Sequence, residues 1–373
     1  MKRPRSGFAV LGGAALVALM SSRAKAQRLE ERGSVVGGVE FRSVRFGEGL
    51  GVNRVQQLVF PAGLVIPAGR LSFDVGTSYA STTLEGSDGT KRTVSALTDT
   101  QIRAAYTFGR DFLVATAVVN LPTGQTKAPV QDFNLLGAVS SPFYGFPVSS
   151  YANGLSVTAA LAAAVPAGEW NVGIAGSLRS TQAYTPYVDV NGPFKYDPGI
   201  EGRVRIGADR VVSASRFTIG LTYSTLGTDE LSPSGQSTSQ YRPGKRWIGE
   251  VSLATAVGSG SALFYGWHVR RSSGESLGLS IGNRESLTSG GVLARWPLAS
   301  RLTGSLGVEG QLLSQDASSG KMIGASGRLE VGLSDRVVFE PMVRYDVGSV
   351  GPKSSASSSI RGTYLAAFIR GLF

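Results

Sequence analysis

Long runs of alternating apolar and polar residues recur along almost the whole chain. Within residues 301–312, Leu302 and Leu306 fall on one face of an extended strand, whereas Glu309 and Gln311 fall on the other. A period of two residues predicts β-strands. The same pattern occurs in three further segments, residues 170–179, 216–224 and 337–347. Runs of this length exceed the roughly five to six residues common in soluble sheets, and they suit a tilted strand that crosses a bilayer.

A sheet that spans a membrane has to close on itself. Hydrocarbon offers no partner to the free N–H and C=O groups of a sheet edge, so strands can span only as a barrel. A soluble β-sandwich would also alternate, but aromatic residues gather near the ends of the runs, where a membrane barrel has its interfacial girdle. These residues are Tyr106, Phe108, Trp247, Trp296 and Tyr345. We therefore expect an all-β fold, a transmembrane, antiparallel, up-and-down β-barrel.

The connections between the runs alternate in length. Short turns are expected near Gly69, Gly168 and Gly258, and longer polar stretches such as residues 228–245 lie between such turns. Short periplasmic turns and longer external loops are typical of outer-membrane barrels. From Arg70 to the carboxy terminus the pattern predicts about 14 strands.

The segment before residue 70 has two interpretations. Residues 35–46 and 52–67 either add two strands, which makes 16, or form a plug in the lumen. Pro61 and Pro67 weaken the strand interpretation, because proline withholds a ladder hydrogen bond. The predicted domains are a signal peptide at 1–26, an amino-terminal segment at 27–51 that is a candidate lumen plug, and a β-barrel at 52–373.

The first 26 residues have the pattern of a cleaved secretory signal. A basic start with Lys2 and Arg3 precedes the apolar stretch Gly7–Met20, and a small-x-small cleavage site ends at Ala26. The apolar stretch is too short to span a bilayer as a helix. We therefore expect export, and a mature chain that begins near Gln27.

Composition argues against several kinds of site. The chain has no cysteine and one histidine, so a disulfide, a redox pair or a cysteine zinc site cannot form. No acidic loop has calcium spacing, and the glycines do not gather at a strand-to-helix turn. The net charge of +11 includes five basic residues before Gln27, which leaves +6, and the remaining basic residues are interleaved with acids. We expect no metal, no cofactor and no nucleic-acid partner.

Two parts of the sequence resemble known outer-membrane proteins. Phe373 ends an alternating segment, and an aromatic terminus of this kind resembles the sorting signal of Gram-negative outer-membrane barrels. Residues Ala96–Arg103 and Leu121–Gly124 resemble the paired motifs of outer-membrane transporters associated with aromatic-compound degradation, which are similar in plan to FadL-like channels. The resemblance implies location in the cell outer membrane, contact with the barrel-assembly machinery through the last strand, and uptake of small molecules.

Charged residues on the polar faces are predicted to line the lumen, because an Arg or Lys facing lipid costs about 2–4 kcal/mol at the midplane. The lumen or selectivity candidates are Arg103, Arg179, Arg203, Arg205, Arg216, Glu250, His268, Glu309, Arg328 and Arg344. Two interpretations stay open. The charges either form a salt-bridged interior that braces the wall, or they line a wet passage whose arginines favour anionic solutes.

The connection at residues 122–151 is unusually apolar for an external loop. Its candidate capture residues are Phe133, Phe143, Tyr144 and Phe146. Exposed apolar clusters often mark ligand sites or interfaces. The loop therefore either enters the mouth and offers a capture site to a hydrophobic molecule, or, as we favour slightly, packs on the barrel rim or within lipopolysaccharide.

The single histidine has to be weighed for catalysis. Some outer-membrane lipases and proteases use a histidine on the wall, and a hydrolase would place a nucleophile beside it. No such local pattern surrounds His268, and Asp99, beside Thr98 and Thr100, is interpreted as fixing a strand end. We expect no catalytic residue and no enzyme activity, and we assign His268 to hydrogen bonding in the lumen.

The expected function is passive uptake of small molecules, with hydrophobic or aromatic compounds as the candidate class. A general diffusion porin is the first alternative, and a non-conducting structural barrel is the second. The expected partners are outer-membrane lipid and lipopolysaccharide, the barrel-assembly machinery and a small-molecule solute.

Overall fold

The computed structural model describes residues 32–109, 112–125, 127–129, 132–189, 192–235, 237–276, 279–282 and 284–373. The predicted signal peptide lies outside these residues. Within them, no helix is long and apolar enough to cross a membrane.

The main structure is an antiparallel β-barrel of 16 wall positions with one extra strand segment. The extra segment arises because β4 and β5 both pair with β3, one along each half of its length. The predicted all-β antiparallel barrel is therefore confirmed, and of the two predicted strand numbers, 16 is the one found. The wall strands are β1 (Ser34–Phe46), β2 (Val52–Ala68), β3 (Leu71–Gly86), β4 (Lys91–Leu97), β5 (Thr100–Phe108), β6 (Leu113–Leu121), β8 (Ser156–Ala167), β9 (Trp170–Thr181), β12 (Glu201–Val212), β13 (Ser215–Leu226), β16 (Arg246–Val257), β17 (Gly260–Arg271), β20 (Glu285–Ala299), β21 (Leu302–Gln315), β22 (Ser318–Gly332), β23 (Val337–Pro352) and β24 (Ser358–Leu372).

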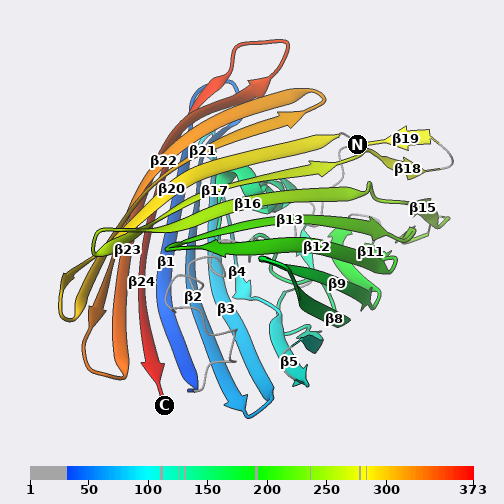
Figure 1. Ribbon diagram of the computed structural model, residues 1–373. Helices are drawn as coiled ribbons and strands as arrows, with labels where there is room; N and C mark the ends of the chain where they lie inside the picture. Colours follow the sequence, from blue (N-terminus) through cyan, green and yellow to red (C-terminus); the bar gives the residue numbers. More distant parts are fainter. Residues whose placement is uncertain are drawn as a thin grey trace.

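The first and last strands close the ring. β1 pairs with β24 along its whole length, and the blue and red strands lie side by side in Figure 1. The candidate plug is therefore a wall strand over Ser34–Phe46. Pro61 lies within β2, and the β1–β2 ladder skips from Gly37 opposite Ala62 to Glu40 opposite Val59. Because proline has no N–H, the pairing between β1 and β2 is interrupted at this point. The pairing between β2 and β3 continues past the proline.

The wall has an apolar outer surface, and the predicted alternation explains it. On the outer faces of β9 and β21, Leu178, Leu306 and Leu312 are 63%, 62% and 61% exposed. The aromatic residues expected in the girdle are also exposed on this surface. Tyr106 packs edge-on against Phe108 with ring centroids 4.6 Å apart. An apolar band with aromatic ends is typical of a barrel that spans a bilayer.

The short turns fall where the sequence predicts them, for example between β2 and β3 at Gly69 and between β16 and β17 at Gly258. Both glycines have positive φ, 64° and 58°, a conformation that glycine adopts without steric cost. The longer connections at the opposite end carry further structure. This comprises a five-stranded sheet of β7 (Ala128–Pro129), β10 (Tyr184–Asp189), β11 (Gly192–Asp197), β14 (Asp229–Pro233) and β15 (Ser239–Tyr241), and the hairpin of β18 (Gly274–Ser276) and β19 (Leu279–Ile281).

Candidate functional site: a loop packed inside the barrel

The connection between β6 and β8 turns inward and packs against the inner face of the wall. We call residues 132–155 the inner loop; it contains the helix α2 (Phe133–Ser140) and the 3-10 helix η3 (Pro142–Tyr144). Its buried side chains join a cluster with inward residues of the first and last strands. The cluster includes Val44, Val55, Val59, Leu84, Leu135, Val139, Phe143, Phe146, Val148, Tyr151, Leu313, Met322 and Ile360. Of the two predicted placements, the one that enters the barrel is found. The placement that the sequence favoured, on the rim or within lipopolysaccharide, is wrong, because the inner wall offers the loop an apolar surface.

Phe143 is the deepest side chain of the inner loop, with no exposed surface. Its ring lies over Gly320 of β22, where a Cβ atom would come within 2.9 Å of the ring. A larger residue at this inward position would occupy the space of the ring. The glycine therefore provides the seat for Phe143.

Gln57 of β2 fixes the inner loop through its side-chain amide. Nε2 donates to the carbonyl oxygen of Val148 at 2.8 Å, and the N–H of Val148 donates to Oε1 at 2.8 Å. Nε2 also donates to Thr82 Oγ1 at 2.9 Å. Gln57 is fully buried, so these bonds satisfy polar groups that water cannot reach.

Two tyrosines of the inner loop are largely shielded from water where the loop packs on the wall. The hydroxyl of Tyr151 donates to the carbonyl oxygen of Val94 at 3.0 Å and contacts Thr82 Oγ1 at 2.5 Å. Burial raises the pKa of Tyr144 and of Tyr151 to about 12. Both hydroxyls therefore stay neutral throughout the physiological range.

A buried ion pair of the wall, Arg42 with Asp346, contacts the end of η3. Arg42 of β1 donates from Nε to the carbonyl oxygen of Tyr144 at 3.0 Å, and its guanidinium contacts the carboxylate of Asp346 on β23. Asp346 is also bonded by Arg344 at 2.7 Å. Both charges of the first pair are almost wholly buried. Removing one partner of such a pair leaves an uncompensated buried charge, so Asp346 is needed to keep Arg42 at its contact with Tyr144.

Asp99 holds together the two ends of the connection between β6 and β8. Its carboxylate accepts the N–H of Gly124 at 3.3 Å and the N–H of Asn153 at 2.7 Å, and its own N–H donates to the carbonyl oxygen of Tyr151 at 3.1 Å. Asp99 lies between β4 and β5, where the sequence predicted a role in fixing a strand end. The geometry adds that the residue also clamps the two stems of the connection.

The second half of the paired motif completes this clamp. Thr123 Oγ1 accepts the N–H of Thr100 at 2.9 Å and donates to the carbonyl oxygen of Thr98 at 2.9 Å. A Cβ atom on Gly124 would lie 2.2 Å from the carbonyl oxygen of Tyr151. The motif residues thus serve to close the stems of the connection, and a glycine is needed where the chains meet.

The inner loop covers only part of the interior. It packs on β1 to β4 and on β20 to β24, whereas the inner faces of β9, β12, β13, β16 and β17 contribute nothing to the buried cluster except Trp267 at its edge. Among the described residues, the charged side chains on these uncovered inner faces are Arg179, Glu201, Arg203, Arg205, Asp209, Arg216, Arg246, Glu250 and Arg271. Arginines outnumber carboxylates on this side.

These arginines combine ion pairing with access to water. Arg205 contacts Glu250 at 2.6 Å, and Arg216 contacts Asp209 at 3.2 Å, yet the two arginine side chains are 46% and 49% exposed. Arg203 bonds Glu201 at 2.8 Å and is 38% exposed. Because these residues face inward, their exposure indicates solvent space inside the wall. Both predicted interpretations of the charged residues, bracing and a wet interior, are therefore compatible with this geometry.

The other predicted lumen residues also face inward, with one exception discussed below. Arg103 of β5 pairs with Asp74 of β3, and Arg179 Nε donates to Ser156 Oγ at 3.2 Å. On the opposite side of the barrel, Arg344 of β23 bonds Glu309 of β21 at 2.6 Å. Arg328 contacts two carboxylates, those of Glu330 and Glu340. Charges on this side of the barrel are more evenly balanced than on the uncovered side.

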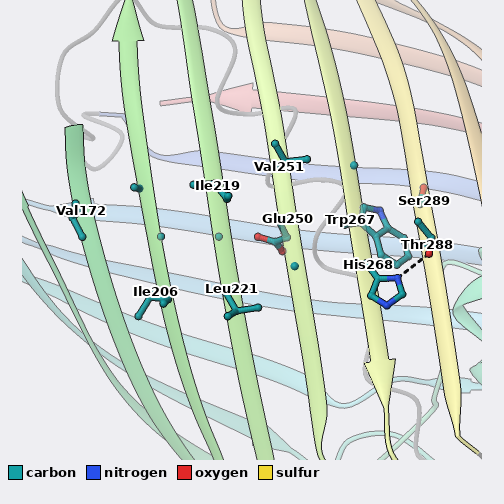
Figure 2. Close-up of a pocket in the computed structure, with 15 residues that line it drawn as sticks. Val172, Ile206, Ile219, Leu221, Glu250, Val251, Trp267, His268, Thr288 and Ser289 are labelled. Carbon is teal, nitrogen blue, oxygen red and sulfur yellow. Dashed lines mark hydrogen bonds between the residues drawn. The ribbon is translucent and has the colours of Figure 1, made fainter. Parts of the chain in front are cut away.

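His268 faces outward, so its predicted place in the lumen is wrong. It lies opposite Gly249 on β16 and Thr288 on β20, and the intervening register places its neighbour Trp267 inside. Figure 2 shows His268 hydrogen-bonded to Thr288, with Nδ1 2.8 Å from Oγ1, beside a depression of about 790 Å³. Apolar side chains line this depression, among them Ile206, Ile219, Leu221 and Val251. The prediction failed because β17 carries apolar residues inside, where Trp267 packs at the edge of the buried cluster.

Two of the four predicted capture residues, Phe143 and Phe146, are not available to a solute. Phe143 and Phe146 are 0% and 8% exposed and form part of the buried cluster. Tyr144 is partly buried and packs edge-on against Phe46 with ring centroids 5.3 Å apart. The side chain of Phe133 lies outside the described residues. Phe143 and Phe146 therefore hold the loop in place, because the inner wall offers them an apolar seat.

Several residues that position the loop were not predicted from the sequence. Gln57 and Arg42 carry only a weak signal, since each is one polar residue on a mixed strand face. On the uncovered side, Arg246 could have been found by extending the alternation from Glu250 along β16. Arg271 could not, because the predicted inward face of β17 was the wrong one. Within the described part of the chain, no group of three or more metal-ligating side chains is present.

Comparisons with known proteins find a likeness in overall form only. No family model and no curated protein matches the sequence. Among solved structures, the CymD monoaromatic hydrocarbon channel shares 11% identity, with 91% of this chain and 88% of that chain covered and a TM-score of 0.43. The DcaP channel of Acinetobacter baumannii shares 12%, with 91% and 97% covered and a TM-score of 0.42. An anion-selective porin from Comamonas acidovorans shares 13%, with 91% and 99% covered and a TM-score of 0.39. Such values carry no conclusion about function.

Proposed function

We propose that this chain is an outer-membrane channel that passes small molecules passively and prefers anionic solutes. The closed wall with its apolar outer band suits a bilayer. The observation that carries the proposal is the division of the interior. The inner loop packs on one side, and the opposite side presents inward, water-accessible arginines such as Arg203, Arg205 and Arg216.

Charge on the uncovered side supplies the selectivity. Rings or rows of charged side chains set the sign of the ions that enter a pore. The arginines there exceed the carboxylates, so the local potential favours anions even though several arginines are paired. Uptake of hydrophobic or aromatic compounds stays a prediction. Phe143 and Phe146, two of its four candidate capture residues, are buried.

A planar-bilayer experiment tests this function. The purified full-length protein is recorded in a KCl gradient, and the reversal potential gives the anion-to-cation permeability ratio. We expect steady current steps and a ratio above one. The double variant R205Q/R216Q should lower the ratio by up to about fivefold for each charge, because two charges 4 Å apart in water interact with roughly 1 kcal/mol.

The matched control is R210Q. Arg210 lies on the same strand as Arg205 but on the outward face, where it pairs with Glu169. The substitution R210Q therefore removes one positive charge without changing the lumen. Absence of current from the correctly folded protein would reject the channel in favour of a structural barrel. An equal shift in R210Q would show that the lumen arginines do not set selectivity, as expected for a general porin.

A further inference from the structure

Three exposed cations lie on the outward face of the wall near its external end. They are Arg45 of β1, Arg361 of β24 and Lys321 of β22, and we call them the external basic cluster. Arg45 and Arg361 are direct cross-strand partners, and Arg54 of β2 lies opposite Arg45 on its other side. Like charges placed directly opposite one another destabilise a sheet. Such an arrangement calls for a negative counter-charge.

Within the described residues, carboxylates do not supply that charge to the external basic cluster. Arg54 pairs with Glu85 at 2.7 Å. Among the residues that the structure describes, by contrast, no ion pair involves Arg45, Arg361 or Lys321. This differs from the lumen, where Arg205, Arg328 and Arg344 each contact a carboxylate. The external basic cluster is therefore exposed and uncompensated.

The cluster borders the apolar band of the outer surface. On the same outward faces, nearer the middle of the wall, Ile323, Tyr345 and Leu365 are exposed at 54%, 51% and 47%. Ile323 is two residues from Lys321 on β22, and Leu365 is four residues from Arg361 on β24. A cation in this position lies at headgroup level if the apolar band lies in hydrocarbon. Aromatic residues such as Tyr345 commonly occupy the same boundary.

We propose that the external basic cluster binds the phosphate groups of a phosphorylated glycolipid in the outer leaflet. Two guanidinium groups and an ammonium match phosphate in charge, and guanidinium can bind phosphate in a bidentate manner. Basic clusters beside a membrane-spanning segment attract anionic headgroups. Phosphate would also relieve the repulsion between Arg45 and Arg361. The inference rests on the proposed membrane location but not on conduction.

Native mass spectrometry of the full-length protein in detergent tests the site. The probes are bis-phosphorylated lipid A, the same lipid after enzymatic dephosphorylation, and inorganic phosphate. We expect binding of the phosphorylated lipid, and a loss of about tenfold or more in affinity for R45Q/R361Q, since each basic residue contributes roughly a factor of five near a headgroup. No current is recorded, so a barrel that fails to conduct leaves this test intact.

The control variant is R301Q. Arg301 is an exposed arginine at the turn between β20 and β21, at the opposite end of the wall, and pairs with Asp335 at 3.0 Å. The R301Q variant should bind the phosphorylated lipid with the same affinity as the unaltered protein. If the double variant fails to fold, R361Q alone should weaken binding severalfold. Equal binding by R45Q/R361Q, equal binding of the dephosphorylated lipid, or equally tight binding of free phosphate would overturn the proposal.

Discussion

Single glycines decide where this barrel can accept a second layer of chain inside it. Gly320 leaves space for the ring of Phe143, and Gly124 lets two backbone segments approach where the inner connection begins. Other glycines, such as Gly244 and Gly348, are approached as closely, but by segments outside the inner loop. The missing side chains at these two positions therefore make room for the inner loop and for the stems of its connection.

Replacing Gly124 by alanine tests this idea. The new Cβ would lie 2.2 Å from the carbonyl oxygen of Tyr151 and 3.0 Å from the N–H nitrogen of Asp99, so the backbone has to move. Overpacking of this kind costs about 1–3 kcal/mol. We expect faster proteolysis of the inner loop and a lower temperature of heat unfolding on gels.

Gly137 provides the matched control for that substitution. It lies on α2 with open space around its Cβ position, and G137A should leave proteolysis and heat unfolding unchanged, or improve them slightly because alanine favours a helix. Equal effects of G124A and G137A would contradict a specific role for the close approach at Gly124.

At the scale of elements, the inner loop acts as one unit held at three places. The clamp around Asp99 closes its stems, Gln57 bonds its extended part, and Arg42 supports η3. Each contact joins the loop to a different strand segment of the wall. The loop is therefore fixed against the wall and narrows the interior from one side.

We predict that Q57L frees the middle of the inner loop. Leucine keeps the approximate size of the side chain but leaves the N–H and C=O of Val148 without partners, at a cost of about 1–3 kcal/mol for each buried group. Limited proteolysis should cleave the loop faster, and single-channel current should become noisier.

The neighbouring residue gives a control for Q57L. Gln56 points to the other face of β2, where its amide donates to Ser43 Oγ at 3.4 Å, so Q56L should preserve the protection of the loop. A loop that stays equally protected in Q57L would show that apolar packing alone holds it.

At the scale of the whole molecule, closure depends on a strand that the sequence left ambiguous. β1 lies between β2 and β24, and without it the last strand would present a free edge. Unpaired edges are not tolerated in hydrocarbon. The barrel therefore closes by using the segment that was also a candidate plug.

A cysteine pair can test the closure directly, because the natural chain contains no cysteine. Val39 and Ala367 are cross-strand partners on β1 and β24, with Cβ atoms expected about 4.5–5.5 Å apart. The variant V39C/A367C should cross-link with a short bifunctional reagent and migrate as a looped chain on denaturing gels. The pair V39C/I174C, with Ile174 on β9, should not. Cross-linking in neither variant would contradict a wall position for β1.

Much of the fold could be predicted from local pattern. The strands of β9, β13, β21 and β23 alternate clearly because one face meets the apolar exterior and the other meets water and charge. The turns could be predicted because glycine and polar residues gather there. The pattern fails at β17, because inward positions of this strand carry apolar residues such as Leu263 and Trp267, and for that reason His268 was assigned to the wrong side.

The sequence by itself determined that strands with one apolar face run along the chain and are separated alternately by short and long connections, because side-chain alternation and turn chemistry are local properties. Only the tertiary structure decided that β1 completes the ring, that the connection after β6 packs inside it, and which arginines remain exposed to the interior. Those outcomes depend on contacts between segments far apart in the chain, such as Phe143 with Gly320 and Arg42 with Asp346, and no local pattern encodes them.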